Sequence, residues 1–230
     1  MYRISLLLLC LFLLPAINVF SQDLVYQEKK GDNKVLYYHY YLSKTSDQHH
    51  FRCVRLSGKD TLEDQILHTD GKYRSKSWDY SRKADQTRVK ASLEGNRVTL
   101  KGIHDGKRIN EIFDLDDYPW IQAFPLNPGL ENWLTGEEEE ITFWVIGTAS
   151  SADMDINRFT AEKKDKEKIM IMGSMLEAQR VNITLAGWRS MFWDGDFYFR
   201  VSDGRIIKYD GGGPPGEPSS VTHLVKEINR

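Results

Sequence analysis

The feature that most constrains this chain is a two-residue alternation of apolar and polar side chains. Val181, Ile183 and Leu185 alternate with polar residues, and Phe197 and Phe199 repeat the pattern further along. A period of two is typical of a β-strand with one buried face and one face in water. The alternation recurs along most of the chain, which predicts an all-β fold.

Short turn sequences rich in Gly, Asp and Asn separate the alternating segments. Asp203-Gly204 lies between two apolar runs and is a strong hairpin signal. Similar turn sequences occur at residues 31–33, 57–60, 69–72, 94–96 and 104–107. Such short connections exclude parallel crossovers and predict an antiparallel meander of about 11 to 13 strands. We also expect turns at Asp194-Gly195-Asp196 and at Lys163–Lys168, and a last edge strand at Val221–Ile228.

The segment from Asp116 to Thr135 differs from the rest of the chain. It contains three prolines and two tryptophans, and its composition predicts one or two short helices. We expect Trp120, Ile121, Phe124 and Leu126 to pack inward from this segment. A long meander must curl to bury its apolar face. The predicted architecture is therefore all-β with a minor α content, an open or half-closed barrel with one or two short covering helices.

The N-terminus predicts export. Arg3 precedes an apolar run from Ile4 to Leu14, which is too short to span a bilayer at ~20 residues. Pro15 and the small residues that follow favour cleavage before Gln22. We therefore interpret residues 1–21 as a signal peptide and residues 22–230 as a single β-rich periplasmic domain, with no transmembrane segment in the mature chain.

Charge and cysteine content narrow the classes of function. The 230 residues carry a net charge of -2, and no basic excess indicates nucleic-acid binding. Cys10 lies in the predicted signal peptide, so Cys53 is left without an intramolecular disulfide partner. We interpret Cys53 as a buried structural thiol, because neither an adjacent base nor a site that lowers its pKa can be identified.

Several polar groups could carry chemistry, but each has a simpler structural interpretation. Neighbouring histidines on a strand point to opposite faces and do not easily share a metal. The paired aspartates lack the glycine and glutamate of a calcium-binding loop. Ser190 lacks the Gly-x-Ser-x-Gly context of a nucleophile elbow. We therefore predict no catalytic residue, no metal and no cofactor. The groups considered are His49-His50, Asp153 with Asp155, Asp194 with Asp196, Glu137–Glu140 and Ser190.

Aromatic residues are the remaining signal. Most would serve core packing, but an apolar groove with few polar groups is also the usual form of a ligand site. The aromatic residues considered are Tyr37, Tyr38, Tyr40, Tyr41, Trp78, Tyr80, Trp188, Phe192, Trp193, Phe197 and Phe199. The residues that we predict to line a groove for a ligand are Trp120, Ile121, Phe124, Trp188, Trp193, Phe197 and Phe199.

About 50 residues of the C-terminal part form a recognisable pattern. They are Ala178, Arg180-Val181, Ile183, Gly187, Phe192-Trp193, Phe197-Tyr198-Phe199, Asp203-Gly204-Arg205 and Ile206–Tyr209, with Val221–Val225 after a run rich in Pro and Gly. With these residues the chain resembles a family of exported bacterial β proteins of unknown function. The family is in turn distantly similar to the periplasmic lipoprotein carriers of the Lol system, whose half-barrels hold acyl chains. The resemblance implies fold rather than activity.

Three hypotheses of function remain at this stage. The first is a binding or carrier protein for a lipid or another apolar ligand of the cell envelope. The second is a non-catalytic structural or assembly factor that binds an envelope protein. The third, a hydrolase, is the least supported, because no catalytic set is recognised. A continuous apolar cavity would favour the first hypothesis, and a filled core would favour the second.

Overall fold

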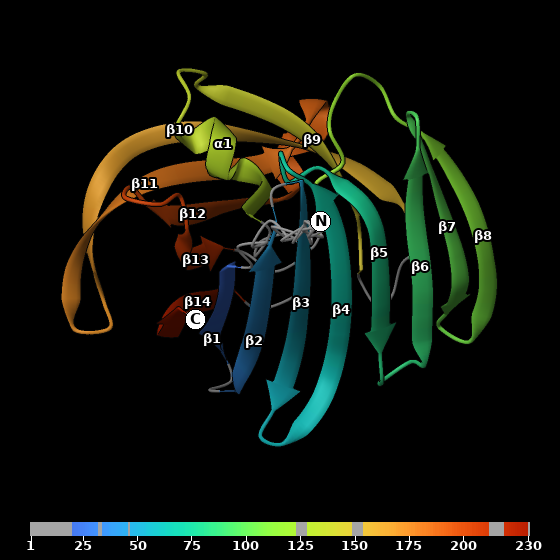
Figure 1. Ribbon diagram of the computed structural model, residues 1–230, viewed down its shortest axis with the longest axis horizontal. Coiled ribbons are helices and arrows are strands. Elements are labelled where there is room, and N and C mark those ends of the chain that lie inside the picture. The colour runs from blue at the N-terminus through green and yellow to red at the C-terminus, as the bar shows by residue number, and fades with distance from the viewer. Residues whose placement is uncertain are drawn as a thin grey trace, which may run out of the picture.

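The computed structural model describes residues 20–31, 34–45, 47–122, 128–148, 154–211 and 219–229. Within these residues the chain forms one antiparallel sheet of 14 strands (Figure 1). The strands follow the order β8-β7-β6-β5-β4-β3-β2-β1-β14-β13-β12-β11-β10-β9 across the sheet. The predicted all-β, antiparallel fold is confirmed, with one more strand than the upper end of the expected number.

The strands of the first half are β1 (Phe20–Lys30), β2 (Val35–Lys44), β3 (Gln48–Ser57), β4 (Asp60–Asp70), β5 (Ser75–Arg82), β6 (Thr87–Glu94), β7 (Arg97–His104) and β8 (Lys107–Asp114). Those of the second half are β9 (Glu140–Ile146), β10 (Ile156–Ile171), β11 (Ser174–Leu185), β12 (Asp194–Arg200), β13 (Ile206–Gly211) and β14 (Ser220–Asn229). Each half is a meander in which neighbours along the chain are neighbours in the sheet.

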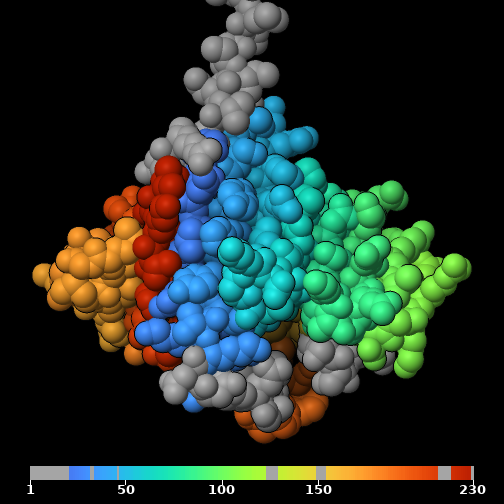
Figure 2. Space-filling model, turned by 90° about the horizontal axis from the view of Figure 1, so that it is seen from below, coloured from blue at the N-terminus to red at the C-terminus, as the bar shows by residue number. Residues whose placement is uncertain are grey.

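The two halves are joined where the first and last strands pair. β14 pairs with β1 on one side and with β13 on the other. Figure 2 shows β14 in red beside the blue β1. The expectation that Val221–Ile228 forms an edge strand is therefore wrong. The edges are instead β8 and β9, the two strands that flank the Asp116–Thr135 segment in the chain.

The alternation of apolar side chains places the core on one face of the curled sheet. Val181, Ile183 and Phe197 are each 0% exposed, and Phe199 is also buried. They belong to one cluster of buried residues that draws on both halves of the sheet. Cys53 is buried in the same cluster, and burial raises the pKa of its thiol. The predicted strand register and the structural thiol are confirmed.

Two predicted turns are strand residues instead. Asp194, Gly195 and Asp196 open β12 and pair with β11. Lys163–Lys168 lies inside β10, where a register shift between Lys163 and Lys166 accommodates the run of charges. The turn between β10 and β11 falls later, at Met172-Gly173. Charged residues and Asp-Gly sequences are typical of loops, and for this reason the sequence predicts turns in the two segments. A strand whose side chains reach water also tolerates such residues.

The predicted short helices are present in the middle segment. η1 (Pro128–Leu130) leads directly into α1 (Glu131–Leu134), and a further 3-10 segment, η2 (Gly187–Phe192), links β11 to β12. Leu130 and Trp133 are buried, so η1 and α1 cover part of the apolar face. In Figure 1, α1 lies near the upper end of the curled sheet. None of the helices in the described ranges has the length and apolar character that crossing a bilayer requires.

A strap at residues 119–122 joins the edge strand β9 to β5. The Trp144 N–H donates to the Pro119 carbonyl at 2.8 Å, and the Ile121 N–H donates to the Trp144 carbonyl at 2.9 Å. On the other side of the strap, the Ser75 N–H donates to the Trp120 carbonyl at 2.9 Å. These bonds satisfy backbone groups that an edge strand would leave unpaired. The sheet is thus half-closed, and β6–β8 extend beyond the closure.

The Gln122 side chain secures this closure. Its Oε1 accepts from the Ile146 N–H at 2.8 Å and from Trp120 Nε1 at 2.9 Å, and its Nε2 donates to the Ile146 carbonyl at 3.0 Å. The Gln122 N–H donates to Ser75 Oγ at 2.8 Å. Gln122 is buried, so water cannot readily replace these bonds.

A second link closes the other end of β5. The Arg82 guanidinium donates to the Thr148 carbonyl just after β9 and to the carboxylate of Asp85, with a shortest distance to Asp85 of 2.5 Å. The hydrogen bond from Arg82, with a further bond from Thr87, lowers the pKa of Asp85 to about 2. Asp85 therefore holds the arginine that reaches across to the second half of the sheet.

Replacing Gln122 should open the strap. Gln122→Leu leaves the Ile146 backbone groups and Trp120 Nε1 without partners, and we expect the free energy of unfolding to fall by roughly 2–3 kcal/mol. The measurement is urea denaturation followed by tryptophan fluorescence. Gln48→Leu, an exposed position at the start of β3, is the matched control and should change it by less than about 0.5 kcal/mol. Equal values for the two variants would contradict the role of the strap.

The Asp85 carboxylate should give the protein an acid-sensitive stability. Its pKa of about 2 in the folded state lies below the ordinary value of about 3.9. Its contribution is therefore fully present above about pH 4 and is lost as pH falls towards 2. Melting temperatures measured from pH 6 to pH 2 should fall less steeply for Asp85→Asn than for the wild type. Asp47→Asn, at an exposed position, should keep the wild-type profile.

Candidate functional site

The end of the curled sheet covered by α1 brings together four parts of the chain. Lys44 at the end of β2 lies 3.6 Å from the Glu131 carboxylate of α1. From β10, Lys163 Nζ donates to the Gly136 carbonyl at 2.7 Å and lies 5.1 Å from the centre of the Trp133 ring. A Cβ added to Gly204, in the β12–β13 turn, would meet Glu131 Cγ at 2.9 Å. Polar side-chain contacts thus hold α1 in place.

Beneath α1 the inner face is aromatic. The Tyr73 ring stacks on His49 with ring centres 4.2 Å apart, and it lies 6.1 Å from Phe51. Burial raises the pKa of Tyr73, as does its hydrogen bond to Glu131. Burial lowers the pKa of His49, because it disfavours the charged imidazolium, so the neutral imidazole is favoured here. This wall combines apolar surface with a few polar atoms.

Two tyrosines of the inner face differ in how their hydroxyls are satisfied. The Tyr26 hydroxyl donates to the Ile206 carbonyl at 3.0 Å. The Tyr40 hydroxyl is buried and finds no hydrogen-bond partner in the described part of the chain. Burial raises the pKa of both groups, so both stay protonated. A buried hydroxyl without a partner is uncommon in a folded protein and is a place where a water or a ligand atom can bind.

A compact charge cluster lies at the same end of the sheet. Glu227 accepts hydrogen bonds from Arg200 and Arg205, each with a contact at 2.9 Å, and from Gln22 Nε2 at 2.8 Å. Asp203 pairs with Arg200 at 2.5 Å. The residues come from β1, from β14 and from the β12–β13 hairpin, so the cluster fixes the join between the first and last strands. Its charges balance, and each has a partner.

Four of the seven predicted ligand-lining residues gather in the core. Trp120, Ile121, Phe197 and Phe199 are all buried and belong to one cluster. The Phe197 ring stacks on Tyr209 with centres 4.5 Å apart. In this structure these four side chains are packed against other protein atoms.

The other three predicted residues lie apart from that group. Trp193 is half-buried and meets Phe159 edge-to-face with ring centres 5.4 Å apart. Trp188 is 73% exposed on η2, where it contacts Phe192. Phe124 lies outside the described residues. The sequence pattern did not distinguish aromatic residues of the core from those on this exposed link.

Sequence reasoning missed the groups that lie under α1. Tyr40 was one tyrosine in a tyrosine-rich strand, and its alternation with the exposed Tyr41 was the available signal that it points inward. Trp133 and Glu131 were placed only in a segment expected to contain a helix. Tyr73 could not be identified, because its backbone φ of 61° places it in a turn rather than in the strand expected from its sequence.

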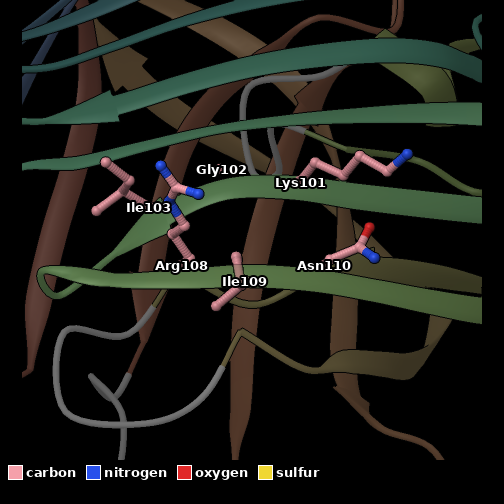
Figure 3. A pocket seen from close by; sticks show the side chains of 6 residues that line it. All are labelled: Lys101, Gly102, Ile103, Arg108, Ile109 and Asn110. Atoms are coloured by element: carbon pink, nitrogen blue, oxygen red, sulfur yellow. The ribbon is translucent and has the colours of Figure 1, made fainter.

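Several surface hollows lie on the outer face of β4–β8. One is lined by Lys101, Gly102, Ile103, Arg108, Ile109 and Asn110 (Figure 3). β7 approaches β6 closely at Gly102, where an added Cβ would lie 2.1 Å from the Arg88 carbonyl oxygen. The neighbouring hollows are lined mainly by polar and charged side chains. These hollows are open to solvent, and none of the seven residues predicted to line a ligand groove lines them.

Thr87 and His104 are as close to each other as a catalytic nucleophile is to its general base. Thr87 Oγ1 lies 3.2 Å from His104 Nδ1, but both residues are buried and Thr87 Oγ1 also accepts from the Asp105 N–H at 3.3 Å. A nucleophile must meet its substrate, so this pair is better explained as packing of the β6–β7 hairpin. In the described ranges, no three His, Cys, Asp or Glu side chains cluster to hold a metal.

No family model and no curated protein matches the sequence. Among solved structures, the fold is similar to a β-barrel-like protein of the domain of unknown function DUF1849 from Brucella abortus, with a TM-score of 0.55 at 14% identity over 92% of this chain and 98% of that one. This likeness confirms the predicted resemblance to bacterial β-rich proteins of unknown function at the level of fold.

Two further solved structures match over similar lengths but with low scores. A LolA superfamily protein from Nitrosomonas europaea has a TM-score of 0.27 at 9% identity, over 94% of this chain and 87% of that one. A DUF1329 family protein from Desulfovibrio piger has a TM-score of 0.30 at 7% identity, over 93% and 86%. Scores this low carry no argument about the present chain.

The two inner tyrosines give a matched pair of variants. Tyr26→Phe removes a buried hydrogen bond and should lower the free energy of unfolding by about 1 kcal/mol or more. Tyr40→Phe removes a hydroxyl that has no protein partner and should leave stability unchanged or raise it by up to about 1 kcal/mol. Urea denaturation checks both values. An equal loss for both variants would mean that the Tyr40 hydroxyl is already satisfied.

Proposed function

We propose that the protein is exported to the periplasm, where it binds and carries an apolar or lipid-like ligand of the cell envelope without catalysing a reaction. The observation that carries the proposal is the aromatic inner face beneath α1, with the buried Tyr40 hydroxyl set in it. Sites for small ligands are mostly apolar and contain a few placed polar groups that orient the ligand. The proposed export rests on residues 1–21, of which residues 1–19 lie outside the described part of the chain.

In this proposal α1 is the movable cover. It is four residues long, and the contacts that hold it include the Lys44–Glu131 ion pair and the bond from Lys163 to Gly136. A single turn of helix has little stability of its own and depends on such contacts. Displacement of α1 would expose Trp133 and the aromatic wall, and an acyl chain would take the place of those contacts.

A second candidate function is that of a non-catalytic assembly factor for an envelope protein. It is favoured by the tight packing of the predicted ligand-lining residues and by the position of β8 at one end of the sheet. An edge strand can bind an extended segment of a partner by adding a strand to the sheet. The binding experiment below separates the two candidates.

The test measures ligand binding directly. Native mass spectrometry of the protein purified from cells should show a co-purified lipid, and the delipidated protein should bind the fluorescent fatty acid cis-parinaric acid. The ion pair that holds α1 contributes roughly 0.2–1 kcal/mol, so Lys44→Ala with Glu131→Ala should speed probe uptake by up to about fivefold.

A matched control removes an ion pair elsewhere. Arg97→Ala with Asp114→Ala deletes an exposed pair of 2.8 Å on β7 and β8, away from α1, and should leave the uptake rate unchanged. If neither the wild type nor the α1 variant binds the probe or retains a lipid, the carrier proposal fails and the assembly role is preferred. Equal acceleration by both variants would contradict the role of α1 as the cover.

A further inference from the structure

The turn between β10 and β11 carries an unusual concentration of methionine. Met170, Met172 and Met175 are three of the six methionines in the chain, and they lie within six residues. They are 61%, 55% and 58% exposed. The hairpin that bears them projects from one side of the molecule in both views, in orange (Figures 1 and 2).

The strand register brings the three side chains together. Met170 and Met175 are direct partners across the β10–β11 ladder. Directly opposed residues share one face of the sheet, with Cβ atoms about 4.5–5.5 Å apart. Met172 is the first residue of the two-residue turn that joins the strands. Methionine has three rotatable side-chain bonds, so the three thioethers can converge at the tip of the hairpin.

Packing does not account for these methionines. The apolar residues that the hairpin buries lie on its other face, where Ile171 is 5% exposed and Ile169 and Leu176 pack against the core. On the methionine face the next ladder pair is Lys168 with Glu177, which is the polar pattern expected of a wetted face.

The turn itself does not call for methionine either. Met172 and Gly173 have φ angles of 52° and 77°, a conformation that two-residue hairpins usually fill with Asn-Gly or Asp-Gly. A residue with a long side chain is therefore held in a conformation that disfavours it. Neither core packing nor turn geometry explains why thioethers occupy all three positions.

We propose that Met170, Met172 and Met175 form a thioether site for a soft monovalent cation, Cu(I) or its analogue Ag(I). Thioether sulfur is a soft neutral donor that selects Cu(I) over Zn(II), Mg(II) or Ca(II), which take imidazole, thiolate or oxygen ligands. The site involves no redox step, since the ion binds and leaves as the monovalent species. Its nearest charged ladder pair, Lys168 with Glu177, is balanced.

The residues described around the three methionines offer no set of ligands that would favour a harder metal ion. Cys53, the one cysteine in the described ranges, is buried, and burial raises the pKa of its thiol, so it is not available as a competing thiolate. The described residues contain no cluster of three His, Cys, Asp or Glu side chains that would favour a borderline or hard metal ion. Exposure at the tip leaves the site open to exchange the ion with another protein.

The experiment is NMR spectroscopy of the protein without the predicted signal peptide, labelled with 13C at the methionine methyl groups. Each methionine then gives a separate resonance. Ag(I), a redox-stable probe, should shift the resonances of Met170, Met172 and Met175 and saturate at one equivalent. The resonances of Met154, which is buried, and Met191, which is 78% exposed on η2, should stay in place. Zn(II) should shift none of the five.

Variants separate metal binding from apolar contact. Met170→Leu, Met172→Leu and Met175→Leu together keep the volume and apolar character of the tip but remove its sulfur atoms. The triple variant should lose the Ag(I) shifts and should no longer withdraw Cu(I) from bicinchoninate under anaerobic conditions. Met191→Leu is the matched control and should retain both properties. Far-ultraviolet circular dichroism verifies that the triple variant is folded.

Two results would overturn the proposal. One is the absence of any shift of the three tip methionines at one equivalent of Ag(I). The other is a triple variant that binds Ag(I) and Cu(I) as the wild type does. Either result would leave the exposed tip as an apolar surface whose thioethers have no metal-binding role.

Discussion

The structure depends on one constraint, which is that a single large sheet must bury its apolar face without a second layer to cover it. The helical segments in the described ranges are at most six residues long, so they cannot serve as that layer. The sheet therefore curls until side chains from its two halves meet, and Val181, Phe143 and Leu100 are buried in one cluster. The hydrophobic effect stabilises the curled sheet by a free energy proportional to the apolar area removed from water. The curved shape of the sheet follows from it.

Curling such a sheet leaves two edge strands with unpaired backbone groups, and the chain provides hydrogen-bond partners among the described residues for only one of them. The free side of β9 is bonded by the strap at residues 119–122, and Gln122 and Arg82 extend the link to β5. β8 stays at the end of the sheet, and charged side chains at Lys107, Arg108 and Glu111 line it. Charges on an edge strand discourage uncontrolled pairing between chains. The same edge remains open to a partner whose sequence matches it.

The candidate functional features lie at different places on this framework. The inner face beneath α1 joins aromatic rings to a few polar atoms, and the buried Tyr40 hydroxyl is one of those without a hydrogen-bond partner in the described part of the chain. The tip of the β10–β11 hairpin carries exposed sulfur on the face that the core does not use. A ligand in the interior and a cation at the tip would not compete, because they bind to opposite faces of the sheet. Neither feature depends on the open hollows of the outer face.

The sequence by itself determined the strands, the buried side chains within them and the all-β class, because a period of two is set by local backbone geometry. It also located the helical segment, from its proline and tryptophan content. Only the tertiary structure decided that β14 pairs with β1, that Lys163–Lys168 stays in a strand, and that Trp188 is exposed. It also decided that the Tyr26 hydroxyl has a hydrogen-bond partner while the Tyr40 hydroxyl has none in the described part of the chain. The physical reason is that strand pairing and side-chain contacts join residues up to about 200 positions apart, as Gln22 and Glu227 show, and local periodicity carries no information about such partners.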